Sequence, residues 1–580
     1  CTAVSLAQFA NRPAPVAARH PKDVTVHGDT RIDDYFWLRE KENPDVRAYL
    51  EAENAHTEAA LAPAAELRDT LYQEMRARIK EDDVGAKTPF RGWFYYTRTE
   101  KDKQYPLYCR ARSESGDHEE VLLDLNVLGA GKPYIAIGDY RVSDDGARLA
   151  YSIDWTGYRQ YEVFVLDLAT KRAVPQAIGK VSGLAWAAGH DVLYYITENE
   201  AKRSDKLHRW DLATGRHELL YTEPDELYNL VVFRTRDSRY LICEAQSKLT
   251  TEARVLRADD HTGHFRVLLP RTENHEYHAD FRDGRFYLVT NRDAKNFRVV
   301  SAPEDKPDEW TEVIAARPAV KVDSVDLFAT HMVVHEREDG LPQLAVYDFA
   351  THQSKRIALP DAVYEVGDAE NWNYDATEYR YAYESLARPP SVYASDFATG
   401  ERHLVKQTEV PGFDTASYVA TRVWAVARDG TRIPLSVVCR RDLDRTKPQP
   451  LWLYGYGSYG VSQPVSFSST RLSLLDRGFI FVIAHVRGGG ELGEDWREAG
   501  RMERKVTTFT DFVDCGQWLV DQRWTTSAQM VTAGRSAGGL LMGAVINLRP
   551  ALFKAALIVV PFVDVLNTML DASLPLTTEE

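Results

Sequence analysis

The chain has 580 residues, of which 44% are hydrophobic, and it carries 71 Lys and Arg against 86 Asp and Glu, a formal net charge of −15. A chain of this length exceeds one ordinary hydrophobic core, so at least two domains are expected. The acidic balance disfavours nucleic-acid binding, and the sequence contains no run of about 18 apolar residues that could span a bilayer as a helix. We therefore expect neither nucleic acid nor a membrane as a partner.

The cysteines indicate no disulfide framework and no zinc site, because they are odd in number, widely spaced and include no C-x-x-C pair (Cys1, Cys109, Cys243, Cys439 and Cys515). The chain begins with cysteine rather than methionine. We expect a cytoplasmic protein. The periplasm is the alternative if Cys1–Gln8 is the remnant of a secretory signal or the acylated start of a lipoprotein, and a fragment boundary is a third explanation.

Residues 1–82 are expected to form an N-terminal helical arm. Asn43 followed by Pro44 is typical of a helix N-cap with proline at the first helical position. Pro63 separates this helix from a second one that ends near residue 83. From about Pro89 the pattern changes to short strands.

The middle of the chain contains a repeat, in which a strand ends in Asp and is followed by an apolar residue and a turn. The copies lie 44, 49, 88 and 48 residues apart, at Asp167, Asp211, Asp260, Asp348 and Asp396. The long step predicts a degenerate copy near Glu304, and Ser113 is a further candidate 54 residues before the first marker. Seven units with a period of about 40 to 50 residues are typical of propeller blades. We assign residues 83–412 to a seven-bladed β-propeller, with a β-sandwich array as the alternative.

Residues 413–580 alternate buried apolar strands with helices, the pattern of a parallel α/β sheet. The apolar spacing along 509–520 predicts a helix between the second and third strands. The expected strands are 451–454, 479–486, 530–533 and 556–560. The propeller is thus predicted to be inserted between the arm and this C-terminal domain.

The candidate nucleophile is Ser536. The segment Gly534–Gly538 fits G-x-S-x-G and lies between a predicted strand and a predicted helix. Glycines at both ends allow a turn sharp enough to hold the serine in a strained backbone conformation, with its hydroxyl exposed beside a helix N-terminus. A structural Gly-Ser turn is the alternative.

A nucleophilic serine needs a base and a third group that orients the base. In an α/β-hydrolase these follow in the order Ser, Asp or Glu, His. None of the 44 residues after Ser536 is a histidine, and Asp564 and Asp571 come too early, because only one further strand precedes them. We expect the triad Asp and His to lie beyond Glu580, in about 100 further residues that complete the C-terminal part of this domain.

Two other glycine-rich stretches follow predicted strands. Gly455–Gly460 fits G-x-G-x-x-G, but Pro464 and few helix formers follow it, so no dinucleotide site is indicated. Arg487–Gly493 lacks the Lys-Ser/Thr pair of a phosphate loop and is interpreted as a tight turn near the active face.

Several of these segments together resemble the prolyl oligopeptidase family of serine peptidases (peptidase S9). They are 453–460, 473–478, 484–493, 508–512 and 534–543. The stretch 560–577 looks specifically like the oligopeptidase B branch, and Asp33–Arg39 is similar to the family's opening motif. The resemblance covers the whole chain.

The resemblance implies an α/β-hydrolase catalytic domain capped by a seven-bladed propeller, in agreement with the repeat count. It implies cleavage of short basic peptides after Arg or Lys through an acyl-enzyme at Ser536, with no metal or organic cofactor. It also implies that the backbone N–H of Ala537 and the phenol of Tyr456 form the oxyanion hole.

Substrate binding is carried over from the family to three residues, Tyr459, Glu579 and Glu580. Glu579 is the best candidate for the carboxylate that binds a basic P1 side chain, and Glu580 is a possible second, although the usual glycine and aromatic residue are missing before them. Some bacterial members carry an Asp-x-Asp pair where this chain has Pro464 and Ser466. A preference for two consecutive basic residues is therefore not expected.

Two alternative functions remain open from the sequence. The first is an esterase or acylaminoacyl-type peptidase of the same fold. The second is a catalytically inert propeller binding protein, which the absent histidine favours.

Overall fold

The computed structural model of the chain describes residues 13–174, 178–571 and 574. Contacts divide the chain into two units, Cys1–Ile79 and Lys80–Glu580. Within the described residues, no helix is long and apolar enough to cross a membrane. Cys109, Cys243, Cys439 and Cys515 are buried free thiols.

The N-terminal unit consists of a hairpin followed by helices. The hairpin strands β1 and β2 are joined by His27 and Gly28, which both have positive φ, as a tight primed turn requires. Asn43 caps α1 by accepting a hydrogen bond of 2.9 Å from the backbone N–H of Asp45. The two predicted helices are confirmed, and the predicted break between them is the short η3. The elements are β1 (Lys22–Val26), β2 (Asp29–Asp33), η2 (Phe36–Arg39), α1 (Pro44–Leu61), η3 (Ala62–Ala64) and α2 (Ala65–Ala77).

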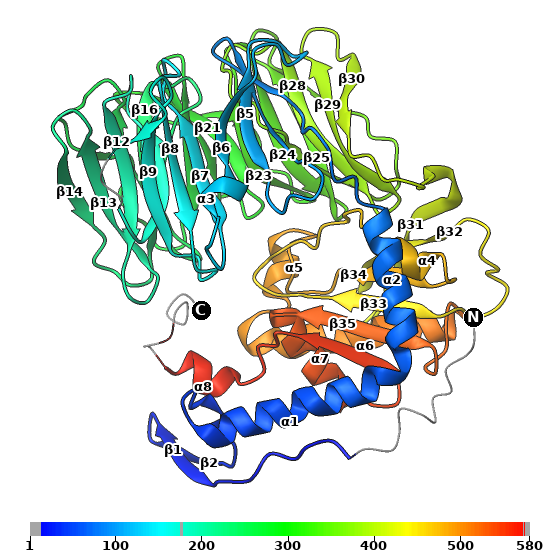
Figure 1. The fold of residues 1–580 in the computed structure, drawn as a ribbon. Coiled ribbons are helices and arrows are strands. Elements are labelled where there is room, and N and C mark those ends of the chain that lie inside the picture. The colour runs from blue at the N-terminus through cyan, green and yellow to red at the C-terminus, as the bar shows by residue number, and fades with distance from the viewer. Residues whose placement is uncertain (1–12, 175–177, 572–573, 575–580) are drawn as a thin grey trace. The chain divides into compact units, whose positions relative to one another are not determined.

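Seven four-stranded antiparallel sheets follow, and each is built from four consecutive strands. Figure 1 shows these blades in colours from blue through cyan to green. The seven-bladed propeller predicted from the repeat is therefore confirmed.

The first four blades are β3 (Thr88–Phe90), β4 (Trp93–Arg98), β5 (Leu107–Ala111) and β6 (Glu120–Asp124), followed by the short α3 (Leu125–Leu128); β7 (Ala136–Val142), β8 (Arg148–Asp154), β9 (Tyr161–Asp167) and β10 (Arg172–Ala173); β11 (Val181–Trp186), β12 (Val192–Glu198), β13 (Ser204–Asp211) and β14 (Arg216–Thr222); and β15 (Asn229–Arg234), β16 (Tyr240–Gln246), β17 (Thr251–Arg257) and β18 (Arg266–Val267). The last three blades are β19 (Tyr277–Arg282), β20 (Arg285–Thr290), β21 (Arg298–Pro303) and β22 (Thr311–Ile314); β23 (Val320–Leu327), β24 (His331–Glu338), β25 (Leu341–Asp348) and β26 (Gln353–Arg356); and β27 (Glu365–Asp368), β28 (Glu378–Ser385), β29 (Arg388–Asp396) and β30 (Arg402–Gln407).

The repeated Asp marks the turn from the third to the fourth strand of a blade. The carboxylate of Asp396 accepts hydrogen bonds from the backbone N–H groups of Ala398 (3.0 Å) and Thr399 (2.8 Å), and the other marker carboxylates make the equivalent contacts. Such an Asx-type contact fixes the turn, which explains the recurrence of Asp. Glu304 and Ser113 follow the third strands β21 and β5 of their blades, as the spacing predicts.

The propeller ring closes without sharing a strand between its first and last blades, so side chains make the closure. Thr88 Oγ1 of the first blade donates a hydrogen bond of 2.9 Å to Glu370 of the last. The ring of Trp372 lies 5.7 Å from that of Phe90 in an edge-to-face arrangement and 5.5 Å from that of Tyr95, measured between centroids.

The catalytic domain is built on a six-stranded sheet with the order β31-β32-β34-β33-β35-β36, in which the last four strands run parallel. The four strands and the helix expected from the sequence are confirmed as β33 to β36 and α6. The strands are β31 (Tyr418–Val426), β32 (Arg432–Arg440), β33 (Leu451–Gly455), β34 (Ile480–Ala484), β35 (Met530–Arg535) and β36 (Ala555–Val559). The helices are η4 (Thr415–Ser417), α4 (Leu472–Leu475), α5 (Glu494–Glu498), η5 (Met502–Arg504), α6 (Lys505–Asp521), α7 (Ala537–Leu548) and α8 (Val565–Met569).

Two antiparallel strands, β31 and β32, extend this sheet and are absent from the strands expected from the sequence. Most residues of β31 are only half-buried, and Thr and Arg interrupt its apolar residues, so the strand carries little signal. β32 is almost fully buried, but it contains Pro434. Proline is uncommon inside a strand, so the sequence pattern of β32 is weak.

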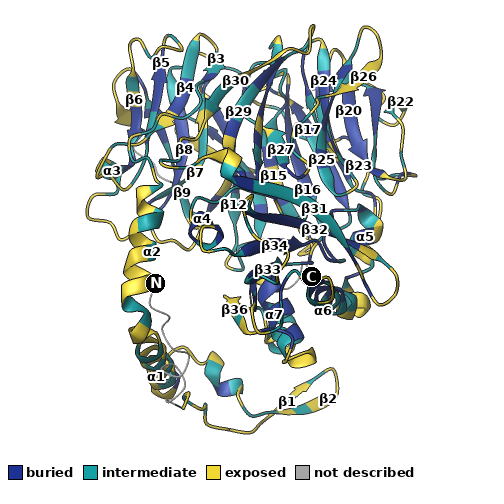
Figure 2. Cartoon of the chain, turned by 90° about the vertical axis from the view of Figure 1, so that its right-hand side faces the viewer, coloured by how far each residue is buried: buried dark blue, intermediate teal, exposed yellow. Residues whose placement is uncertain are grey.

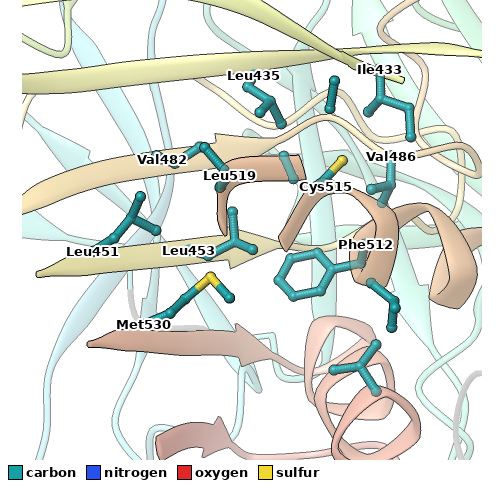
Figure 3. Close-up of a cluster of buried hydrophobic side chains, with 14 of the residues drawn as sticks. Ile433, Leu435, Leu451, Leu453, Val482, Val486, Phe512, Cys515, Leu519 and Met530 are labelled. Carbon is teal, nitrogen blue, oxygen red and sulfur yellow. The ribbon is translucent and has the colours of Figure 1, made fainter. Parts of the chain in front are cut away.

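The core of the catalytic domain lies between the sheet and α6. Figure 3 shows Phe512 of α6 beside Leu453 and Met530 of the central strands, and all three are fully buried. In Figure 2 the strands β33 and β34 are largely covered, whereas the edge strand β36 is exposed. The segment with Ser536 follows β35, which pairs with β33 on one side and with the exposed β36 on the other.

Replacing Trp372 with Ala should weaken the closure of the propeller. We expect a loss of about 2 to 4 kcal/mol in the free energy of unfolding, because a large, partly buried aromatic side chain is removed. Urea denaturation measures this loss.

Trp310→Ala is the matched control, since Trp310 packs on a cluster formed by two neighbouring blades, neither of which is the first or the last of the ring. Limited proteolysis should cut the Trp372 variant near residues 80–90 and spare the control. Equal resistance of the two variants would show that Trp372 does not close the ring.

Candidate active site

Ser536 occupies the turn between β35 and α7. Its backbone has φ of +58° and ψ of −119°, a conformation that non-glycine residues rarely adopt. Ser536 N–H donates to the carbonyl of Val559 (3.0 Å), and the carbonyl of Ser536 accepts from Gly539 N–H (2.8 Å). These bonds hold the backbone of the turn while the residue remains exposed to solvent, as predicted from G-x-S-x-G.

The glycines around Ser536 are required by close backbone contacts. A Cβ on Gly534 would lie 2.1 Å from the carbonyl oxygen of Gly538, and a Cβ on Gly538 would lie 2.8 Å from that of Gly455. A Cβ on Gly539 would lie 2.6 Å from the Cα of Pro561. Any side chain at these positions would push the turn apart.

Ala537 is the first residue of α7. Backbone N–H groups in the first turn of a helix have no intrahelical acceptor, and the helix dipole adds positive potential there. Ala537 is buried next to the exposed serine. An N–H in this position can donate to an oxygen that becomes negative on a substrate bound to Ser536.

Tyr456 lies directly beside the turn. It follows β33, is half-buried, and its Cδ2 would be 3.3 Å from a Cβ on Gly538. Its ring centroid is 6.3 Å from that of Tyr459, an exposed residue with φ of +61°. The structure thus brings together Ser536, Ala537, Tyr456 and Tyr459, the four described residues assigned to the site from the sequence.

The loop that carries Tyr456 is held from below by α6. Lys505 Nζ donates to the carbonyl of Gly457 (2.5 Å) and to Ser458 Oγ (2.6 Å). Thr508 Oγ1 donates to the carbonyl of Arg487 at 2.7 Å. Lys505 is a residue that the sequence analysis did not assign to the site, since a lysine at the start of a helix carries no motif of its own.

The segment Arg487–Gly493 is a turn that packs against the Tyr456 loop. Gly460 N–H donates to the carbonyl of Gly488 (3.0 Å), and a Cβ on Gly488 would lie 2.3 Å from the carbonyl oxygen of Gly457. Arg487 makes ion pairs with Asp511 and with Asp429 (2.7 Å), and its hydrogen bond lowers the pKa of Asp429 to about 2. The turn therefore supports the loop together with α6, to which Arg487 is itself paired through Asp511.

His485 is not placed to act as the base. Its ring is 4% exposed, Nε2 lies 2.8 Å from Ser436 Oγ, and Nδ1 lies 3.2 Å from Glu491 Oε1. The backbone N–H of Gln463 also donates to Glu491 Oε1 at 2.9 Å. The pair is a buried support for the segment after Tyr459. Among the described residues, none forms a hydrogen bond with Ser536 Oγ that would identify a base.

Among the acidic residues that follow Ser536, Asp564 has a hydrogen-bond partner of its own, and Glu579 and Glu580 lie outside the described residues. Asp564 precedes α8 and accepts a hydrogen bond from Asn567 Nδ2 at 2.9 Å. Glu579 and Glu580, the predicted P1 carboxylates, lie outside the described residues, as do Cys1–Gln8.

Two propeller carboxylates accept backbone hydrogen bonds from the segment around Pro464 and Ser466. This segment contains no acidic residue of its own. Val465 N–H donates to Glu365 (3.4 Å), and Phe467 N–H donates to Glu384 (2.8 Å). Burial raises the pKa of Glu365. Sequence spacing could not have found them, because they are about 80 to 100 residues away in the chain.

A cavity of about 370 Å³ lies beside Ser536, between the propeller and the catalytic domain. One wall is apolar, with Leu540, Phe562, Val565 and Met569, and Ala537 and Tyr459 also line it. Four of the described residues that line the cavity are charged, and all four are cations. They come from the propeller and the catalytic domain: Lys248, Arg497, Arg501 and Lys505.

Comparisons with known proteins match both halves of the chain. Residues 15–408 match the family model of the N-terminal β-propeller domain of prolyl oligopeptidase, and residues 465–580 match the prolyl oligopeptidase family model. Dipeptidyl aminopeptidase BI of Pseudoxanthomonas mexicana is 39% identical over 605 aligned positions, covering 100% of this chain and 83% of that protein.

Two further relatives share most of the chain. Protease 2 of Moraxella lacunata is 33% identical, covering 98% of this chain and 83% of that protein. The structure of oligopeptidase B from Leishmania major superimposes with a TM-score of 0.93 at 34% identity, covering 98% of this chain and 85% of that one.

Gly534→Ala should remove the competent geometry of the nucleophile turn. The new Cβ must displace the carbonyl of Gly538, so we expect labelling of Ser536 by a fluorophosphonate probe to fall at least about a hundredfold, the scale of one misplaced catalytic group. Labelling of the full-length protein and its thermal midpoint are measured.

Gly543→Ala is the control for this substitution, because it also adds one methyl group to the region but meets only the Cγ1 of Val563, at 3.3 Å. It should label like the native protein. Normal labelling of Gly534→Ala would mean that the turn can relax around a side chain.

Proposed function

Since the chain belongs to the prolyl oligopeptidase family of serine peptidases, we propose that it cleaves short peptides on the carboxyl side of Arg or Lys through an acyl-enzyme at Ser536. The observation that carries the chemistry is the turn itself: an exposed serine with positive φ, followed by the first N–H of α7 and flanked by the ring of Tyr456. This arrangement is suited to acyl transfer.

The proposed reaction has two halves. In the first, Ser536 Oγ loses its proton to a histidine base, the partner that follows the nucleophile in this fold, and attacks the scissile carbonyl carbon. The carbonyl oxygen becomes negative and accepts hydrogen bonds from Ala537 N–H and the Tyr456 hydroxyl. The C–N bond then breaks, and the proton moves from the histidine to the departing amine. In the second half, water releases the acyl group from Ser536 by the same steps.

Contacts between the propeller and the catalytic domain support the proposal that the substrates are short peptides. Lys248 of the propeller lines the same cavity as Ala537 of the catalytic domain. Lys295 forms an ion pair with Asp495 (2.5 Å), and Lys321 forms one with Glu494 (2.9 Å), so three propeller lysines contact or face the nucleophile side of the catalytic domain. We propose that a peptide reaches Ser536 by passing between these two parts, a route that would exclude folded proteins.

The Arg or Lys preference rests on the resemblance of 560–577 to oligopeptidase B and on relatives named Protease 2 and oligopeptidase B. The charged residues among the described lining of the cavity are all cations. The carboxylate that binds a basic P1 side chain therefore has to come from another segment. We assign this role to Glu579, with Glu580 as a second acid.

A second candidate is release of dipeptides from a free N-terminus, which the 39% identity to dipeptidyl aminopeptidase BI favours. The two candidates differ in the substrate end that they require. A blocked N-terminus prevents the second activity and leaves the first unaffected.

Ser536→Ala should abolish hydrolysis of every peptide while the thermal midpoint stays unchanged, because the side chain is exposed. Tyr456→Phe should lower kcat by about 10²- to 10³-fold with little change in KM, the scale for one lost oxyanion donor. Steady-state kinetics of the full-length protein measure both. If the Tyr456 variant changes KM alone, the phenol binds the ground state and is not part of the oxyanion hole.

The P1 preference is tested with Arg and citrulline naphthylamides, which have nearly the same shape but differ in charge. A carboxylate facing P1 is left unpaired by citrulline, so kcat/KM should favour Arg by at least about a hundredfold. Each substrate is used with a blocked and with a free N-terminus.

Glu579→Gln should reduce the Arg preference sharply, and Glu580→Gln should reduce it less. Equal hydrolysis of Arg, citrulline and Ala substrates would exclude the basic P1 site and favour the esterase or acylaminoacyl-type alternative. Activity that requires a free N-terminus would instead support dipeptide release.

A further inference from the structure

We propose that the cavity beside Ser536 binds a carboxylate of the peptide substrate, through a cation cluster formed by Lys248, Arg497, Arg501 and Lys505. The carboxylate is an acidic side chain close to the scissile bond or the terminal carboxylate of a short peptide. This inference rests on the proposed peptidase function and adds a second charge requirement to it.

Arg501 carries the proposal furthest. It lines the cavity, is half-buried and follows Gly500 in the segment between α5 and η5. Its guanidinium donates to Met502 Sδ at 3.4 Å, a weak acceptor, and makes no ion pair with a described carboxylate. A partly buried guanidinium that ends at a cavity and has only a thioether as a side-chain acceptor is well suited to receive an anion.

Arg497 is held rigidly on the same wall. It forms an ion pair with Glu494 at 3.1 Å and donates to the carbonyl of Lys248 at 3.3 Å. Its Cδ would lie 2.8 Å from a Cβ on Gly460, so its stem packs on the Tyr456 loop. A substrate anion would therefore meet a positioned group rather than a mobile one, which reduces the entropy lost on binding.

Lys505 and Lys248 place two ammonium groups around the same space. Lys505 Nζ donates hydrogen bonds to Gly457 O and Ser458 Oγ. Lys248 Nζ lies 5.7 Å from the centroid of the Tyr459 ring. The four cations thus line the same cavity as Tyr459 and Ala537.

Two described carboxylates face this cluster. Glu494 is shared between Arg497 and Lys321, and Glu276 of the propeller interacts electrostatically with Arg497 and Arg501. Among the described residues, these two carboxylates face the four cations of the cluster and Lys321. In a chain with a net charge of −15, Arg501, which makes no ion pair with a described carboxylate, adds positive potential beside Ser536. This potential favours a negatively charged group on the ligand.

The test uses matched internally quenched peptides with one Arg at P1. One set carries Glu or Gln at P2, P1′ or P2′, and a second set ends in a free carboxylate or an amide. We expect the native full-length enzyme to favour the anionic member of at least one pair by about tenfold in kcat/KM. In Arg501→Gln this ratio should fall below about threefold, and raising the salt concentration should reduce it in the native enzyme.

Arg504→Gln is the matched control, because it removes an exposed positive charge three residues away that does not line the cavity. It should retain the native ratio. Equal cleavage within every pair, or a preference that survives in Arg501→Gln, would overturn the proposal. The two peptide sets show whether the carboxylate belongs to a side chain or to the peptide terminus.

A wrong peptidase function and a wrong carboxylate-binding site would give different results. If no peptide of either set is cleaved, the proposed function is wrong. Binding of the same labelled peptides to Ser536→Ala, followed by fluorescence anisotropy, then tests the cation cluster alone. Equal affinity for anionic and neutral peptides in that assay would also overturn it.

Discussion

The site depends on one steric constraint, the approach of backbone segments to distances that no side chain allows. The carbonyl oxygens of Gly538 and Gly457 lie only 2.1 Å and 2.3 Å from where a Cβ on Gly534 or on Gly488 would be. Because these positions are glycines, the turn at Ser536 can present its hydroxyl, and the Tyr456 loop can lie directly against it. The strain of the positive φ at Ser536 is balanced by the backbone hydrogen bonds on both sides of the turn.

Charge is distributed unevenly in this acidic chain. The repeat carboxylates are used in turns, where they bond to backbone N–H groups, and the arginine of the glycine-rich turn is held by Asp511 and Asp429. The charged residues that the structure describes around the cavity beside Ser536 are cations instead. If Glu579 supplies the P1 acid as proposed, the two charge requirements together select peptides that carry both a basic and an acidic group near the cleaved bond.

The propeller contributes to the site as well as covering it. The short α5 contacts Lys295 and Lys321 of two blades through its acidic residues and also carries Arg497, whose side chain lies on the Tyr456 loop. Lys248 reaches the same cavity from a third blade. A change in how the blades contact α5 would therefore alter the cavity lining directly, without passing through the core of the catalytic domain.

The sequence by itself determined the blades, the strands β33 to β36 and the position of Ser536, because each depends on local patterns: a repeated Asp turn, apolar runs, and glycines around one serine. It did not predict β31 and β32, whose patterns are weakened by polar residues and by Pro434. Tyr456 was assigned only through a family resemblance. The roles of Lys505, Arg501, Lys248 and the two propeller glutamates were decided by the tertiary structure alone, since they come from segments up to several hundred residues apart. A charge acquires a role in a cavity only when folding determines which other charges share its surroundings, and spacing along the chain does not record this.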